Sequence, residues 1–234
     1  MKKGRIVAMG GGGFDDGEMM PVFERIVAMT EKAAPKVISL PTASFDHLDG
    51  EEELETIFKG LGCSSFETIT LSNTQLTREE VRAKLLGADI VFVGGGNLEF
   101  LMNTWNATGA TEALREAFAQ GIVLAGVSSG AMCWFDEGYD DCRGDEQFLF
   151  VDCVGLLPYC NCPHFESEYW QSVIPALRER DSRPYSCIGC ENGAAIVYCD
   201  GKYEAVHGNG GRGKVWFMDK DNDFALSEVD ASKL

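Results

Sequence analysis

Short apolar runs alternate with amphipathic segments through the first 130 residues of the chain. The apolar runs predict buried strands at Ile6–Met9, Lys36–Leu40, Ser65–Leu71, Ala88–Val93 and Ile122–Gly126. Between them, apolar residues recur at helical spacing and predict helices at Glu18–Ala33, Asp49–Leu61, Thr77–Leu86 and Ala110–Ala119. Strands separated by such helices indicate βαβ units and a parallel sheet. Because the strands are apolar almost throughout, we expect that sheet to be covered on both faces.

The pattern changes near residue 184, where short β runs follow one another without helices between them. These runs are Tyr185–Gly189, Ala194–Cys199, Tyr203–His207 and Lys214–Met218, and Asp200-Gly201 marks a hairpin turn. They predict an antiparallel extension at one edge of the parallel sheet. The chain shows no linker, low-complexity segment or internal repeat, so we expect one domain over residues 1–234.

The net charge and the hydropathy of the chain exclude some classes of binding partner. The formal net charge of −17 disfavours nucleic acid and anionic membrane surfaces, because both require clustered Lys and Arg. The N-terminal apolar run is too short for a signal peptide, and no stretch approaches the roughly 20 apolar residues of a membrane span. We therefore expect a cytoplasmic protein with no membrane partner. A homodimer stays open, since composition does not select an oligomeric state.

Nine cysteines form an odd number, so they cannot all pair. The only close pairs are Cys160-x-Cys162 and Cys187-x-x-Cys190, and no helix follows the second pair as it would in a thioredoxin-like motif. Cysteine inside apolar runs behaves as a small hydrophobic residue. We expect mostly reduced core thiols, and we expect neither a metal nor an organic cofactor.

The chemistry of the chain centres on the segment Gly126-Val127-Ser128-Ser129-Gly130, which follows an apolar strand and opens a helix-compatible run. This G-x-S-x-G pattern is typical of a nucleophile elbow, in which a tight strand-to-helix turn exposes a serine Oγ. Glycines flank the serine because a Cβ would clash where the backbone folds back. The alternative is a glycine-rich turn whose serine only caps the helix.

A serine nucleophile needs a general base, and the chain has three histidines: His47, His164 and His207. His164 ranks first, because it lies in an irregular loop behind Pro163 and before a predicted helix at Glu166–Arg180. Composition cannot choose the orienting acid among 37 carboxylates. Glu191 is attractive because it ends a predicted strand before a turn. Asp136 and Glu137 are alternatives that are more typical of a solvated acidic loop.

A second glycine cluster, Gly94-Gly95-Gly96, follows the most apolar strand. Glycines there free backbone N–H groups to point at an anion, so the loop is a candidate phosphate cradle or half of an oxyanion hole. The spacing of nucleotide-binding glycine motifs is absent from it. Gly10–Gly13, after the first strand, has the same ambiguity.

Four motifs in order resemble those of the dipeptidase E/cyanophycinase family of serine peptidases. They are Gly94-Gly95-Gly96-Asn97, Gly126-Val127-Ser128-Ser129-Gly130-Ala131, Pro163-His164-Phe165 and Glu191-Asn192-Gly193-Ala194-Ala195. The resemblance covers nearly the whole chain. It implies a three-layer α/β/α sandwich with a mostly parallel sheet, similar to class I glutamine amidotransferases. It also implies Ser128 as nucleophile, His164 as base, Glu191 as orienting acid, and the amides of Gly95 and Ser129 as the oxyanion hole.

The sequence departs from the family in two features. Ser129 stands where alanine usually follows the nucleophile. Members that cleave after an N-terminal aspartate hold its carboxylate with arginines, and no motif for them can be matched. Arg178, Arg180 and Arg183 are substitutes by proximity in sequence only.

The sequence therefore predicts a serine hydrolase that cleaves dipeptides or short peptides through a Ser-His-Glu triad. An esterase or amidase with the same triad is the alternative within the class. A non-catalytic module that uses its glycine loops to hold an anion is the alternative from another class.

Overall fold

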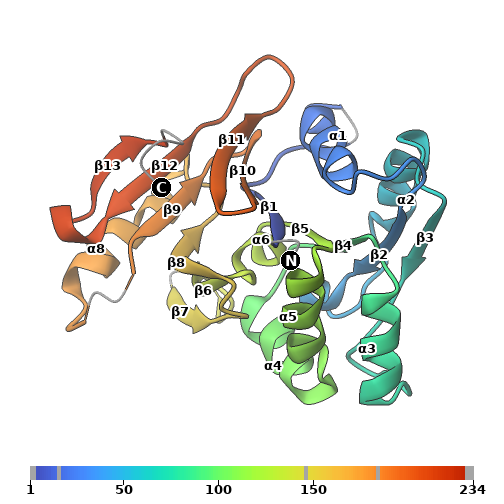
Figure 1. Ribbon diagram of the computed structural model, residues 1–234. Helices are drawn as coiled ribbons and strands as arrows, with labels where there is room; N and C mark the ends of the chain where they lie inside the picture. The colour runs from blue at the N-terminus through green and yellow to red at the C-terminus, as the bar shows by residue number, and fades with distance from the viewer. Residues whose placement is uncertain (1–3, 15–16, 145–146, 183–184, 230–234) are drawn as a thin grey trace.

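The computed structural model describes residues 4–14, 17–144, 147–182 and 185–229, which form two β-sheets and the helices that cover them (Figure 1). The first sheet has seven strands in the order β11-β10-β1-β5-β4-β2-β3. Its strands are β1 (Arg5–Met9), β2 (Lys36–Leu40), β3 (Ser65–Thr68), β4 (Ile90–Val93), β5 (Val123–Val127), β10 (Ala194–Cys199) and β11 (Lys202–His207). The first five of these are parallel to one another, and β10 and β11 add to β1 as an antiparallel hairpin.

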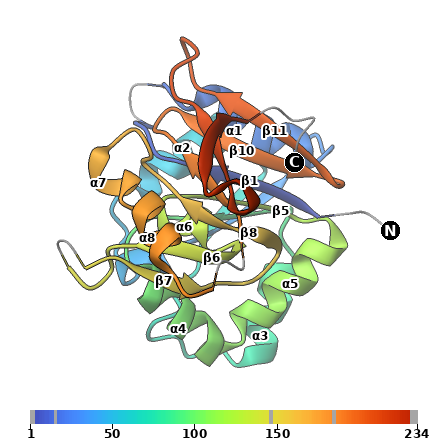
Figure 2. The same cartoon turned by 90° about the vertical axis from the view of Figure 1, so that its left-hand side faces the viewer.

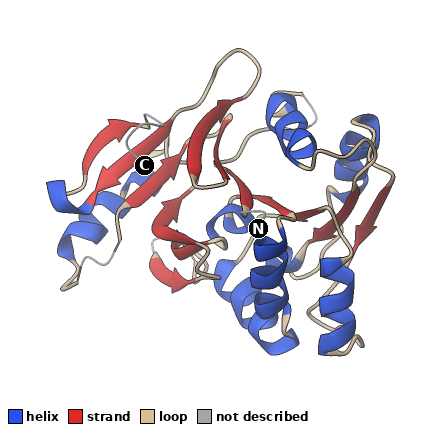
Figure 3. Cartoon of the chain, viewed as in Figure 1, coloured by secondary structure: helices blue, strands red, loops and turns tan. Residues whose placement is uncertain are grey.

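Helices cover both faces of the seven-stranded sheet (Figures 1 and 3). Alternate residues of β1 show this, because Val7 and Met9 belong to one apolar cluster and Ile6 and Ala8 to another. The first cluster includes α1 (Met20–Met29) and α2 (Glu51–Gly60). The second includes α3 (Arg78–Leu86), α4 (Leu98–Thr108) and α5 (Ala110–Gln120). The predicted α/β class is confirmed. Thr77 and Glu80 form a capping box at the start of α3.

The second sheet has six strands in the order β13-β12-β9-β8-β6-β7, and Figure 2 faces it. Its strands are β6 (Phe135–Asp140), β7 (Leu149–Asp152), β8 (Leu157–Cys162), β9 (Cys187–Cys190), β12 (Val215–Asp219) and β13 (Ala225–Glu228). The short helices α7 (Glu168–Gln171) and α8 (Val173–Glu179) pack on one face. The other face shares a core with the seven-stranded sheet. The short helix α6 (Ser129–Met132) and the 3-10 turns Thr42–Ser44 and Lys220–Asn222 complete the elements.

The second sheet corrects the expectation of a simple antiparallel extension. Only β10 and β11 extend the parallel sheet, whereas β9 and β12 belong to the second sheet. The predicted irregular loop before His164 is the strand β8, which lies between β6 and β9 and is parallel to both. Pro158 is tolerated there because the ladder between β6 and β8 shifts register between Phe135 and Glu137, leaving a position that needs no N–H donor. The likeness to class I glutamine amidotransferases and the single domain stay predictions.

The acidic segment after the elbow is also not a solvated loop. Glu137 lies in β6 and is only 6 % exposed. Its carboxylate accepts two hydrogen bonds from the Arg180 guanidinium, at 2.7 and 3.0 Å. The guanidinium carbon of Arg180 also lies 4.1 Å from the ring centre of Phe150. A buried carboxylate is therefore matched by a cation from the end of α8, which the sequence pattern does not reveal.

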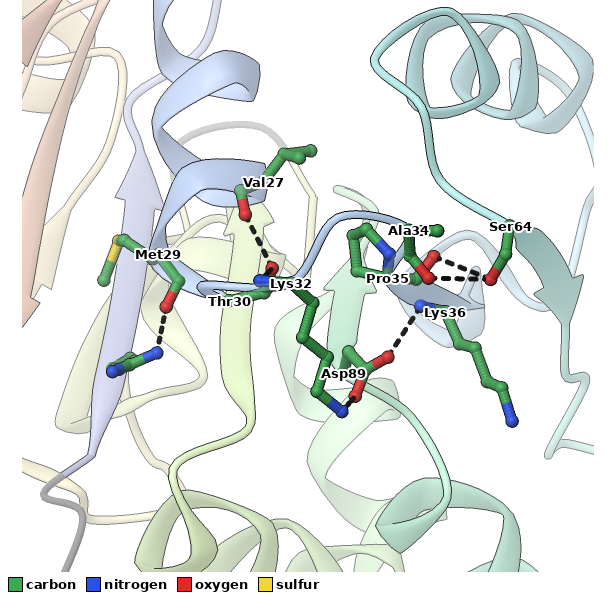
Figure 4. A network of polar contacts seen from close by, with 10 residues as sticks. Val27, Met29, Thr30, Lys32, Ala34, Pro35, Lys36, Ser64 and Asp89 are labelled. Atoms are coloured by element: carbon green, nitrogen blue, oxygen red, sulfur yellow. Dashed lines mark hydrogen bonds and ion pairs between the residues drawn. The ribbon is translucent and has the colours of Figure 1, made fainter.

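Polar contacts connect the amino ends of the neighbouring strands β2, β3 and β4 (Figure 4). Asp89, just before β4, accepts the Lys36 backbone N–H at 2.9 Å and pairs with the ammonium of Lys32. Ser64, just before β3, donates to the carbonyl of Ala34 at 2.9 Å. These contacts fix the starts of β2, β3 and β4 relative to one another. Among the described residues, no helix has the length and apolar character needed to cross a membrane.

We expect Arg180→Ala to lower the free energy of unfolding by about 3 kcal/mol, because it leaves the buried Glu137 carboxylate without its partner. Urea unfolding followed by fluorescence measures this. Lys84→Ala, which breaks the exposed Lys84–Glu67 pair, is the control and should cost less than about 1 kcal/mol. Equal small losses in both variants would contradict the role given to the buried pair.

Candidate active site

Ser128 lies on the sharp turn between β5 and α6 with φ 55° and ψ −121°. An L-residue adopts this backbone conformation only when its surroundings enforce it, at a cost of about 1–3 kcal/mol. Here the Ser128 N–H donates to the Met9 carbonyl at the end of β1, at 3.1 Å. The flanking glycines have the steric role that the sequence predicts. A Cβ on Gly126 would lie 2.1 Å from the Gly130 carbonyl oxygen, and one on Gly130 would lie 2.2 Å from that of Val93.

His164 reaches Ser128 from the end of β8. Its Nε2 lies 3.0 Å from the Ser128 Oγ, and its backbone has φ 51° in the left-handed region. The His164 N–H donates to the Gly10 carbonyl at 3.2 Å. The other two histidines lie elsewhere. His47 is exposed, and the exposed His207 has its Nδ1 2.9 Å from the Gly213 carbonyl oxygen.

Asn192, and not Glu191, contacts the imidazole. The Asn192 Oδ1 lies 2.7 Å from His164 Nδ1, which corrects the predicted contact of Glu191 with His164. The Glu191 carboxylate accepts from the Trp216 indole at 2.7 Å and from the Lys214 backbone N–H at 3.0 Å. Residues 191–194 form a turn after β9, closed by the bond from the Ala194 N–H to the Glu191 carbonyl at 3.2 Å. In this turn the Glu191 carboxylate points toward Lys214 and Trp216, and the Asn192 amide points toward His164.

Two further contacts hold Asn192 in place. Its backbone N–H donates to the Glu166 carboxylate at 2.9 Å, and the next residue, Gly193, donates to the Gly11 carbonyl at 3.0 Å. Sequence reasoning missed both Asn192 and Glu166. Asn192 stands inside the fourth motif, one position after Glu191, and the turn dipeptide Asn192-Gly193 is the signal that could have pointed to it.

Gly11 makes room for the imidazole and the amide. Its φ is +151°, and a Cβ built there would lie 1.9 Å from Asn192 Oδ1 and 2.6 Å from His164 Nδ1. The glycines after β1 thus let the chain pass directly beneath the His164–Asn192 pair. A glycine is needed at position 11 because the backbone passes too close to these two side chains to leave room for a Cβ.

The second glycine loop lies against the nucleophile. A Cβ on Gly95 would be 3.1 Å from the Ser128 Cβ. Gly96 has φ +142°, and its own Cβ would be 2.3 Å from the Ala43 carbonyl oxygen. The fully buried Ser129 donates from its Oγ to the Gly96 carbonyl at 2.6 Å, so the side chain that replaces the family's alanine ties this loop to the elbow.

The start of α4 holds the same loop from the other side. Asn97 caps the helix through its Oδ1, which accepts the Phe100 N–H at 2.7 Å. The buried Asp140 of β6 accepts the Leu98 N–H at 2.9 Å. Burial raises the pKa of Asp140 to about 6, and the hydrogen bond from Leu98 opposes that rise. The loop is thereby fixed to both sheets.

All nine cysteines are free thiols, and four of them, Cys160, Cys162, Cys187 and Cys190, are buried in β8 and β9. Burial raises the pKa of these β9 thiols, to about 12 for Cys190. Among the described residues, no group of three or more His, Cys, Asp or Glu side chains is arranged to hold a metal ion.

The arginines proposed as carboxylate binders are engaged in other contacts. Arg180 pairs with Glu137, and Arg178 donates to the Asp223 carbonyl at 2.9 Å. Arg183 lies outside the described residues.

The fold and site together define an α/β protein with a serine–histidine pair at the carboxyl end of its parallel strands. The chain belongs to peptidase family S51, whose family model matches residues 6–206. The predicted resemblance to the dipeptidase E/cyanophycinase family is thereby confirmed.

Individual proteins agree with this assignment. The chain is 32% identical over 197 residues to the uncharacterized peptidase YgaJ of Bacillus subtilis, covering 83% of each chain. It is 29% identical over 127 residues to the uncharacterized peptidase Lin0382 of Listeria innocua, covering 52% of this chain and 61% of that one. The crystal structure of a peptidase from an acI-B1 Actinobacterium shares the fold, with a TM-score of 0.70, 17% identity, and coverage of 99% and 96% of the two chains.

We expect Gly11→Ala to slow the reaction of Ser128 with a fluorophosphonate by about 10²-fold or more, because the new methyl displaces the imidazole that activates the serine. The labelling rate, followed by intact mass, measures this. Gly210→Ala is the control, since Gly210 also has positive φ, at +83°, but has open space around it. A wild-type labelling rate in Gly11→Ala would show that the close approach does not matter.

Proposed function

We propose that this protein is a serine peptidase that cleaves dipeptides or other short peptides, with Ser128 as the nucleophile. The observation that carries the proposal is the distance of 3.0 Å between Ser128 Oγ and His164 Nε2, on a backbone turn that exposes the serine. Membership of peptidase family S51 supports the same reaction class.

In the proposed reaction, Ser128 Oγ attacks the peptide carbonyl while His164 Nε2 takes its proton. His164 then gives this proton to the leaving amine, and a water attacks the acyl-enzyme with His164 again as base. Asn192 Oδ1 accepts the Nδ1–H of His164, which keeps the free lone pair of the neutral imidazole on Nε2. An amide in this place orients the base without adding a negative charge, as in the Cys-His-Asn arrangement of papain-like proteases.

The oxyanion of the tetrahedral intermediate would be bound by the backbone amides of Gly95 and Ser129. Ser129 is the first residue of α6, so its N–H lies in the helix turn whose amides have no intrahelical partner. Gly95 stands beside the Ser128 Cβ, and the bond from Ser129 Oγ to the Gly96 carbonyl links the two donors. Donors fixed before the reaction are worth about 3–4 kcal/mol each in related enzymes.

We expect a single fluorophosphonate adduct on the wild-type protein and none on Ser128→Ala, because only a serine activated by a base reacts with this probe. Intact-mass spectrometry of both proteins is the measurement. Ser129→Ala serves as control, since it keeps Ser128 and His164 and should still be labelled. A folded wild-type protein without any adduct would refute the proposal and favour the anion-binding alternative.

Asn192 and Glu191 can be separated by their effects on kcat/KM and its pH profile. We expect Asn192→Ala to lower kcat/KM by roughly 10²-fold, less than the 10⁴-fold loss seen when a triad carboxylate is replaced, because only orientation is lost. Asn192→Asp should move the acid limb of the profile to higher pH, since a carboxylate stabilises the inactive imidazolium.

Glu191→Gln is the variant of Glu191 to be compared with the two Asn192 variants. Its amide oxygen can accept from only one of Trp216 and Lys214, but the side chain keeps its shape and does not contact His164, so the acid limb should stay in place. A loss of activity in Glu191→Gln larger than that in Asn192→Ala would return the role of orienting acid to Glu191.

A further inference from the structure

A cavity of about 150 Å³ lies beside the nucleophile, between the glycine loop and α2. Its wall includes Val127, the residue before Ser128, and Gly95, whose Cβ position is 3.1 Å from the Ser128 Cβ. Sites for drug-sized ligands occupy about 300–1,000 Å³, so a space of this size suits one side chain and not a whole peptide. The cavity is therefore placed to receive the side chain next to an attacked carbonyl.

The deep wall of the cavity is apolar. Phe92 of β4 is fully buried and Leu54 of α2 is 5 % exposed. Phe14 covers them and contacts Phe92 edge-on, with ring centres 6.4 Å apart. Such a wall gains free energy when an apolar side chain displaces water from it.

The mouth of the cavity carries negative charge. Asp49 is exposed there, and Glu51 begins α2. The Glu51 carboxylate is held in place by hydrogen bonds that it accepts from the hydroxyls of the buried Ser39 at 2.9 Å and of Thr68 at 2.6 Å. None of the described residues that line the cavity is a Lys or an Arg. A carboxylate entering this space would meet like charge without a counter-ion.

We propose that this cavity selects peptides with an apolar residue, of the size of leucine or methionine, on the acyl side of the cleaved bond, and that it rejects aspartate and glutamate. The inference rests on the proposed serine peptidase activity. It names a substrate class different from the aspartyl peptides that some members of the family cleave.

The test uses the dipeptides Leu-Gly, Met-Gly, Asn-Gly, Asp-Gly and Lys-Gly with the full-length protein. Leu-Gly and Met-Gly should be cleaved with kcat/KM at least tenfold above Asn-Gly. Asn-Gly should exceed Asp-Gly by a further factor of ten, because the two differ in charge and hardly in shape. A preference for Asp-Gly or Lys-Gly, or cleavage of none of the five by a protein that a fluorophosphonate labels at Ser128, overturns the inference. A lack of labelling overturns the proposed function instead.

Two pairs of variants assign the selectivity to the cavity. Asp49→Lys should raise the ratio of Asp-Gly to Leu-Gly cleavage about tenfold or more, whereas Glu55→Lys, the same charge change at an exposed position of α2 outside the cavity, should leave it unchanged. An equal rise in both variants would mean that only the overall charge acts.

Phe14→Ala enlarges the cavity and should raise Phe-Gly cleavage relative to Leu-Gly about tenfold. Phe66→Ala is its control, because Phe66 stacks on Phe58 in the same aromatic cluster but does not line the cavity. If Phe14→Ala leaves this ratio as it is in the wild type, the side chain does not bind here and the inference fails.

Discussion

The carboxyl end of β1 holds the parts of the site together. Three successive carbonyls, those of Met9, Gly10 and Gly11, accept the N–H groups of Ser128, His164 and Gly193 at 3.0–3.2 Å. β1 pairs with β5 on one side and β10 on the other, and all five of its residues are buried. Its end is therefore a rigid reference for segments that come from β5, β8 and β9. The bonds from Ser128 and His164 to adjacent carbonyls of this segment help to set the distance between the nucleophile and the histidine.

The parallel half of the fold could be predicted because each of its strands and helices has a recognisable pattern in its own stretch of sequence. Apolar strands such as Ile90–Val93 are buried on both faces, and amphipathic helices follow them at regular intervals. The second sheet could not be predicted in this way. The sequence of β6 resembles an acidic loop, because the partner that neutralises Glu137 is Arg180, which lies 43 residues later in the chain. The sequence of β8 predicts a loop, because proline and asparagine, here Pro158 and Asn161, are uncommon in strands. The buried Asn161 is tolerated through its bond to the Ile188 carbonyl of β9.

The residues of the candidate site also differ in how far the sequence could identify them. Ser128 and the glycines around it could be found because a sharp turn requires particular residues at fixed spacing. His164 could be ranked first because only three histidines compete. The partner of His164 could not be fixed, because the choice between Glu191 and Asn192 depends on how the turn after β9 orients two neighbouring side chains. That orientation is set by Trp216 of β12 and by Lys214 just before it, which donate to the Glu191 carboxylate.

Strain at the site is balanced by the rigidity around it. Ser128 and His164 both have positive φ, and such conformations persist only where neighbouring contacts over-determine them. At Ser128 these contacts are the Met9 carbonyl and the glycines that let α6 approach β4. At His164 they are the Gly10 carbonyl and the space left by Gly11. Ser129 adds a side-chain bond between the elbow and the Gly94–Gly96 loop, which an alanine could not make. A chain with this serine therefore has a direct side-chain link between the two segments that carry the proposed oxyanion donors.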